Sequence, residues 1–120
     1  MITIGVDIES VTRFRNIPLN ENKEFYERVF TQKEIAYCTS KASPAQHFAS
    51  RFCAKEACVK ALLQHDPTWK LDLKHIEVRN DKHGRPSIKV VENTDIELAI
   101  SMSHSLDTAI ATVLATRGKK

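Results

Sequence analysis

The sequence predicts a single α+β domain in which a mostly antiparallel sheet packs against one long helix. Three observations predict this: an alternating apolar strand at the N-terminus, a long helical pattern over residues 44–64, and two later pairs of strands joined by polar turns. The chain has 120 residues, 42% of them hydrophobic, so residues 1–120 can build one modest core but leave no room for a second domain.

The opening strand alternates strictly, because every second residue from Ile2 to Ile8 is Ile or Val. We expect these residues to form its buried face, and Asp7 and Glu9 to share the opposite face. Two neighbouring carboxylates repel each other, and a bound cation is one way to neutralise them. The alternative is a solvated acidic strand end.

Residues 11–19 are expected to form a connection. A short helix should follow over residues 23–30. Thr31, followed three residues later by Glu34, predicts a capping box at the start of a second short helix that ends near Cys38.

The long helix has clear start signals, since Ser43 can cap it and Pro44 suits its first position. Within it, Glu56 and Lys60 lie on one ridge, and Arg51 and Lys55 lie on the ridge beside it. An anionic phosphate could meet cations from both ridges, although a simple surface Glu–Lys pair is the alternative. The apolar residues of this helix are Phe48, Phe52, Val59, Leu62 and Leu63.

Two strand pairs complete the predicted fold: residues 74–79 with 87–91, and residues 97–103 with 108–115. Gly84 and Pro86 lie in the turn of the first pair, where hairpin chemistry alone would explain them. His104 lies in the polar tip of the second pair.

Composition narrows the possible functions. The net charge of +3 is mild, aromatic residues make up only 7% of the chain, and no nucleic-acid motif is present, so nucleic acid is not an expected partner. No apolar run approaches the length of a membrane span. Three cysteines without metal-ligand spacing are expected to be reduced thiols. We therefore expect a soluble cytoplasmic protein.

These motifs, in this order, resemble the 4'-phosphopantetheinyl transferase superfamily. The resemblance rests on Val6–Glu9, on Arg51–Glu56 with Lys60 one turn later, on the Gly84–Pro86 turn and on Ser101–Ser105. Length and spacing are most similar to its small members, the holo-acyl-carrier-protein synthases. Two features differ: those small members usually carry an acidic residue where this chain has Ser10, and a Gly-Thr-Gly-like loop soon after the helix lysine.

The resemblance implies an enzyme that transfers the 4'-phosphopantetheine arm of coenzyme A to a serine of an apo-acyl carrier protein and releases 3',5'-ADP. By motif, Mg²⁺, or alternatively Mn²⁺, would be held by Asp7, Glu9 and Glu56. Asp7, Glu56 and Lys60 are the expected catalytic residues. The expected coenzyme contacts are Arg51, Lys55, Lys60, Gly84, Pro86 and His104.

The resemblance also implies partners. Arg13 lies six residues after Asp7, where small synthases carry an arginine that meets the acidic carrier protein. Because small synthases are homotrimers with sites between subunits, we expect the same assembly here. Which carrier is used, whether from fatty-acid, polyketide or peptide synthesis, stays open.

Two other functions remain compatible with the sequence. One is a catalytically weak relative that binds the carrier or coenzyme A without transfer, because the Gly-Thr-Gly-like loop is missing. The other is an unrelated small α+β binding or scaffold domain with solvated charges.

Overall fold

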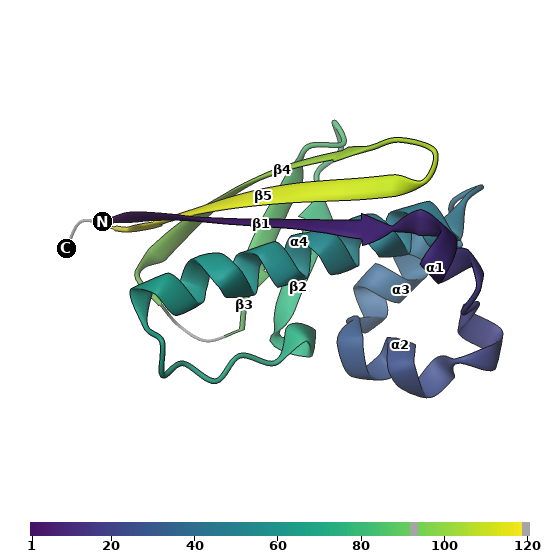
Figure 1. Cartoon of the computed structure of the whole chain (residues 1–120), viewed down its shortest axis with the longest axis horizontal. Coiled ribbons are helices and arrows are strands. Elements are labelled where there is room, and N and C mark those ends of the chain that lie inside the picture. The colour runs from purple at the N-terminus through teal and green to yellow at the C-terminus, as the bar shows by residue number, and fades with distance from the viewer. Residues whose placement is uncertain (92–93, 119–120) are drawn as a thin grey trace.

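The long helix α4 (Pro44–His65) lies across one face of a three-stranded antiparallel sheet in the computed structural model, which describes residues 1–91 and 94–118 (Figure 1). The strands follow the order β1 (Ile2–Ser10), β5 (Thr108–Arg117) and β4 (Ile96–His104). The sheet therefore pairs the two ends of the chain, with Ile2 opposite Thr116. The predicted α+β fold is confirmed.

A second, two-stranded antiparallel sheet consists of β2 (Ile76–Asn80) and β3 (Pro86–Val90). Strand β3 lies against β4, and β2 contacts α4. Both predicted strand pairs are confirmed, with ends that shift by one or two residues.

The short helices that precede α4 occupy one end of the molecule (Figure 1). The chain forms α1 (Val11–Arg15), η1 (Leu19–Glu21), α2 (Lys23–Val29), α3 (Gln32–Thr39) and, later, η2 (Leu73–His75). The expectation of an irregular connection over residues 11–19 was wrong at its start. The Oγ of Ser10 accepts a hydrogen bond from the backbone N–H of Arg13 at 3.1 Å, so Ser10 is the N-cap of α1.

Both predicted N-cap residues occupy their positions, but only one of them makes a side-chain capping bond. The capping box of Thr31 and Glu34 at the start of α3 is present, as predicted. Ser43 occupies the N-cap position of α4, as predicted, but its side chain makes no capping hydrogen bond. Pro44 alone marks the first turn of α4, where its missing N–H costs nothing.

The alternation of β1 was predicted correctly, but the assignment of its buried face was wrong. Thr3 and Gly5 face α4, and a Cβ on Gly5 would lie only 1.9 Å from the backbone oxygen of Ala57. The helix therefore approaches β1 so closely that only small residues fit between them. Asp7 and Glu9 do share a face, but it is the face toward the helix.

The aliphatic residues of β1 point outward instead, with exposed fractions from 51% to 64%. They form what we call the apolar sheet face: Ile2, Ile4, Val6 and Ile8 of β1 with the partly exposed Ile110 and Leu114 of β5. Ile8 pairs with Ile110 and Ile4 with Leu114, so the patch is continuous across two strands.

Two apolar clusters hold the fold together. One lies between α4 and the two sheets, and Trp69 packs its loop against it. The other is aromatic and lies between the short helices and the first half of α4, with Phe14, Tyr26, Phe30 and Phe48 nearly inaccessible to water. Large buried rings supply much of the stabilisation that a chain of this size needs.

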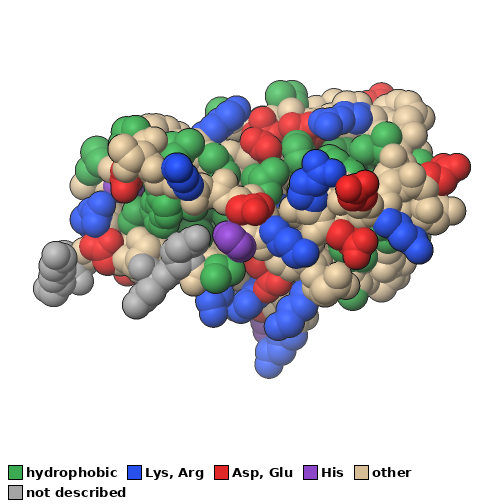
Figure 2. Space-filling model, turned by 90° about the horizontal axis from the view of Figure 1, so that it is seen from below, with side chains coloured by type: hydrophobic (Ala, Val, Ile, Leu, Met, Phe, Trp, Pro, Cys, Tyr) green, Lys and Arg blue, Asp and Glu red, His purple; other side chains and the backbone are tan. Residues whose placement is uncertain are grey.

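The surface shown in Figure 2 intersperses basic with acidic side chains and does not gather one sign into a stripe. Within residues 1–91 and 94–118, no helix has the length and apolar character needed to cross a bilayer.

Candidate active site

The two acidic motifs meet where β1 crosses α4. Lys60 Nζ on the helix donates to Asp7 Oδ1 at 3.3 Å and to the backbone oxygen of Val6 at 3.0 Å. Glu56 lies one turn earlier on the same helix ridge, near enough for the charge of Asp7 to act on it. The predicted convergence of Asp7, Glu56 and Lys60 is therefore present in the fold.

The acidic residues at this crossing are reluctant to ionise together. Burial, followed by the nearby Asp7 with which a proton can be shared, raises the pKa of Glu9 to about 7. Burial also raises the pKa of Glu56, and the charge of Asp7 adds to this effect, while Lys60 and Arg13 oppose it. Burial and the nearby Asp7 thus both favour the protonated forms of Glu9 and Glu56.

The crossing also leaves an oxygen without a partner. Asp7 Oδ2 is buried and accepts no hydrogen bond from any residue that the structure describes. A cation beside it would supply the missing partner and lower the raised pKa values of Glu9 and Glu56. Carboxylate oxygens are the ligands that Mg²⁺ prefers, so the donor set fits this ion.

The protein side of such a site is open. Among residues 1–91 and 94–118, no three Asp, Glu, His or Cys side chains converge to enclose an ion by themselves. Mg²⁺ commonly keeps several waters and shares substrate phosphates, so a partial protein shell is compatible with it.

Two residues that the sequence analysis did not single out position Asp7. Gly5 permits the close contact between β1 and α4, and a glycine inside a strand pattern is a known signal of close backbone approach. The buried thiol of Cys53 donates to the backbone oxygen of Asp7 at 2.9 Å. Nothing in the sequence signals this second contact, because it joins residues far apart in the chain.

The prediction that Lys55 contacts the phosphates of coenzyme A was wrong. Lys55 is fully buried, so it cannot contact a phosphate at the surface. Its ammonium pairs with Oε1 of Glu34, which is equally inaccessible, while Oε2 of Glu34 accepts from the backbone N–H of Val78. Burial lowers the pKa of Lys55 even though Glu34 opposes the shift. The pair ties α3, α4 and β2 together.

Arg51, one turn before Lys55, is only 3% exposed. Its guanidinium donates to Oδ1 of Asn80 at 2.6 Å and lies 3.9 Å from the ring centre of Tyr37. Arg51 therefore contacts the end of β2 in the hairpin that carries Gly84 and Pro86.

The hairpin turn between β2 and β3 makes several hydrogen bonds within itself. Gly84 has a φ of 81°, a value that favours glycine, and its backbone oxygen accepts from Nδ2 of Asn80 at 3.1 Å. Asp81 accepts from the backbone N–H groups of His83 and Arg85. Pro86 begins β3. These contacts join the two sides of the turn.

His104 ends β4 and is exposed. Its ring nitrogen Nδ1 lies 2.8 Å from the side-chain amide of Gln46 near the start of α4. The end of β4 and the start of α4 are therefore joined at the surface.

Arg13 connects this crossing to the outer surface. Its guanidinium pairs with Oε1 of Glu9 at 3.2 Å and lies 5.5 Å from the ring centre of Phe52, while half of its side chain stays exposed. A cation in this position can meet an approaching partner and Glu9 together.

Known proteins match this chain over almost its whole length. The family model of the 4'-phosphopantetheinyl transferase superfamily matches residues 3–114. A holo-[acyl-carrier-protein] synthase of Thermodesulfovibrio yellowstonii is 41% identical over 113 residues, which cover 94% of this chain and 96% of that protein. One from Geobacter sulfurreducens is 38% identical over 124 residues, covering 94% and 95%.

Solved structures agree with these relatives. The ACPS–CoA complex of Chronobacterium ammoniagenes has a TM-score of 0.83 at 29% identity and covers 100% of this chain and 99% of that chain. A holo-[acyl-carrier-protein] synthase of Helicobacter pylori in complex with coenzyme A has a TM-score of 0.78 at 29% identity, covering 94% and 99%. On sequence and fold together, the chain belongs to the 4'-phosphopantetheinyl transferase superfamily.

Proposed function

We propose that this chain is a holo-[acyl-carrier-protein] synthase that transfers the 4'-phosphopantetheine arm of coenzyme A to a serine of an apo-acyl carrier protein and releases 3',5'-ADP. The observation that carries the proposal is the crossing of β1 and α4, which places Lys60 on Asp7 beside Glu56. Phosphoryl transfer depends mainly on positioning and charge neutralisation, and this crossing gathers groups of both signs.

Asp7 and Glu56 would hold Mg²⁺, with Glu9 as a further ligand or as a holder of metal-bound water. The ion would neutralise charge on the coenzyme pyrophosphate. Mn²⁺ can use the same oxygens. The unpartnered Asp7 Oδ2 and the raised pKa values of Glu9 and Glu56 support this assignment.

Lys60 and Glu56 would act on the reacting groups. The ammonium of Lys60 is half exposed and its bond to Asp7 is long, so it is free to turn to a phosphate oxygen and stabilise charge on the leaving 3',5'-ADP. Glu56, whose raised pKa favours uptake of a proton, would receive the proton of the carrier serine.

Five of the six expected coenzyme contacts remain in the proposal. Lys60, Arg51, Gly84, Pro86 and His104 remain proposed contacts for the nucleotide and its phosphates. Lys55 is no longer proposed as a contact, because its ammonium is buried in the core and paired with Glu34.

We propose a homotrimer with the nucleotide partly covered by a neighbouring subunit. The apolar sheet face supports association, since large contiguous apolar patches on a protein surface commonly mark interfaces. Light scattering on Ile4→Glu, compared with the wild type, tests it: the variant should dissociate and lose transfer activity. A monomer that keeps full activity would contradict this assembly.

The acyl carrier protein would dock beside Arg13. Arg13→Glu should raise the KM for the carrier, because it places like charges in contact, and should leave coenzyme A binding nearly unchanged. An equal loss of carrier use and of coenzyme A binding would contradict the assignment.

A cytoplasmic location remains a prediction from the sequence.

The deciding experiment is the intact mass of a purified apo-acyl carrier protein after incubation with this chain, coenzyme A and Mg²⁺. Transfer adds one arm of about 340 Da. The gain should vanish with Glu56→Gln and after removal of metal. Binding of coenzyme A or carrier without any gain, across carriers from fatty-acid, polyketide and peptide synthesis, would favour the binding-only relative.

A further inference from the structure

The turn between β4 and β5 presents an apolar side chain to solvent at its tip. Leu106 is 79% exposed, more than any of the aliphatic residues of β1, which are 51% to 64% exposed. Single exposed apolar side chains are common on protein surfaces, so exposure alone assigns no role to Leu106. Its position in the fold is more informative.

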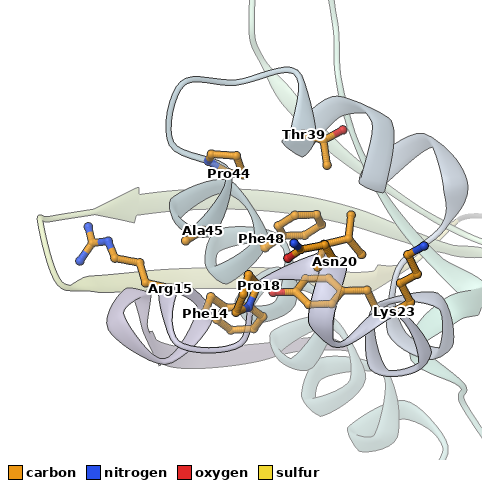
Figure 3. Close-up of a pocket in the computed structure, with 11 residues that line it drawn as sticks. Phe14, Arg15, Pro18, Asn20, Lys23, Thr39, Pro44, Ala45 and Phe48 are labelled. Carbon is orange, nitrogen blue, oxygen red and sulfur yellow. The ribbon is translucent and has the colours of Figure 1, made fainter.

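The turn is bonded to α1 through its backbone. The backbone N–H of Val11 donates to the backbone oxygen of Asp107 at 2.9 Å. The guanidinium of Arg15 donates to the backbone oxygen of Leu106 at 3.2 Å. Figure 3 shows the side chain of Arg15 extending from α1 toward this turn. The contacts with α1 therefore hold the backbone of the turn and leave the side chain of Leu106 in solvent.

Leu106 lies close to the residues that the proposed reaction uses. Thr108, two residues after it, pairs with Ser10, which follows Asp7 by three residues along β1. A strand advances about 3.3 Å per residue, so the turn begins about 10 Å beyond Asp7. A standard protein interface covers about 800 Å² on each partner, a patch roughly 30 Å across. A carrier whose serine reaches Asp7 and Glu56 can therefore also cover Leu106.

The arginines beside Leu106 suit an acidic partner. Arg15 is 46% exposed and lies 3.9 Å from a carboxylate oxygen of Asp107, which is itself 72% exposed. Arg13, two residues earlier on α1, is half exposed as well. Ion pairs at the surface are worth little, so Arg15 can turn to a carboxylate of a partner. An acidic protein surface with an apolar residue would find a cation and an apolar contact side by side here.

We propose that Leu106 is a specificity-determining residue for the acyl carrier protein: it packs against an apolar side chain near the modified serine of the carrier, while Arg15 meets a carboxylate of the carrier. This inference rests on the proposed function and extends the docking surface beyond Arg13. An apolar side chain that loses water on docking adds affinity in proportion to the area it buries. A carrier with a polar surface at this point gains no such affinity.

Direct binding of a fluorescently labelled apo-acyl carrier protein of fatty-acid synthesis, followed by anisotropy without coenzyme A, tests the contact without requiring transfer. Leu106→Ser should raise the Kd for this carrier about fivefold or more, and Arg15→Gln should raise it as well. Val91→Ser is the matched control, because Val91 is 70% exposed at the end of the other sheet, and it should bind the carrier as the wild type does. In transfer assays, Leu106→Ser should raise the KM for the carrier and leave the KM for coenzyme A unchanged.

The possible outcomes separate this contact from the proposed function. If the wild type binds the carrier and Leu106→Ser binds it equally well, the contact is overturned and the proposed function stands. If the wild type neither binds nor modifies carriers from fatty-acid, polyketide or peptide synthesis, both fail together. Light scattering should give the same assembly state for Leu106→Ser and the wild type; a change of that state would assign Leu106 to a contact between subunits and overturn the proposal.

Discussion

Two lysines on α4, Lys55 and Lys60, each face a carboxylate from another element, but in opposite environments. Lys55 and Glu34 are both fully inaccessible to water, and Glu34 makes further bonds to the backbone of Thr31 and Val78. Lys60 is 54% exposed and its contact with Asp7 is 3.3 Å long. Burial therefore decides which charge is fixed in the fold and which can change partners, although both belong to one Lys-Glu-x-x-x-Lys motif.

The strongest test of this contrast removes one partner of the buried pair. Glu34→Ala would leave the Lys55 charge buried without a partner and remove the Glu34 half of the capping box of α3, so the free energy of unfolding should fall by about 3–5 kcal/mol. Urea unfolding measures it. A double variant that also carries Lys55→Met should recover part of the loss; a single variant that loses less than about 1 kcal/mol would show that the pair is not structural.

Removing the exposed Lys60 should lower activity strongly and stability only slightly. Lys60→Ala is expected to lower kcat for arm transfer by about 10²–10³-fold, because stabilisation of leaving-group charge is lost. The free energy of unfolding should fall much less than in Glu34→Ala, because the Lys60 side chain is half exposed. Gln64→Ala, one turn later on α4, is the matched control and should keep its activity. A large loss of stability in Lys60→Ala would remove the distinction between the two pairs.

The contact that brings Lys60 to Asp7 can be broken without touching either residue. Gly5→Ala would place a Cβ 1.9 Å from the backbone oxygen of Ala57, and β1 would have to move away from α4. Overpacking of this kind costs about 1–3 kcal/mol. Thermal melting measures this cost, and transfer activity should fall more than the loss of folded protein explains. Wild-type activity in this variant would mean that the crossing need not be tight.

The acidic side of the crossing predicts a pH effect. Because the pKa of Glu9 is raised to about 7 in the folded chain from an ordinary value near 4.5, the folded state binds more protons between these values. Metal-free protein should therefore lose stability as pH rises from about 5 to 7.5, by about 1 kcal/mol. Melting temperature against pH in a chelator measures it, and Glu9→Gln should flatten the curve. A curve unchanged by Glu9→Gln would show that Glu9 ionises normally.

Periodicity predicted most of the fold because the strands and α4 have strong local patterns. It missed α1, a helix of five residues that is too short to be stable alone and depends on the packing of Val11 and Phe14. It also assigned the wrong buried face to β1. Alternation reveals two faces, but the side on which the helix lies is decided by Gly5, whose small size the pattern does not weigh.

The sequence predicted those residues of the proposed site that belong to the strand motif and the helix motif. Asp7, Glu56 and Lys60 meet as expected because a strand and a helix each present one ridge. Lys55 could not be separated from Lys60 by spacing alone, since its partner Glu34 comes from α3 and the pair forms only in the folded chain. The contact of Cys53 with Asp7 joins equally distant segments.

The two faces of strand β1 serve different roles. Its odd-numbered residues present Asp7 and Glu9 to α4, while its even-numbered residues present an aliphatic row to the outside. Because neighbouring side chains in a strand point to opposite faces, a single inserted or deleted residue would exchange the two rows and send Ile8 toward Glu56. Single substitutions in β1 can therefore be tolerated, whereas an insertion or deletion would disrupt the site and the apolar sheet face together.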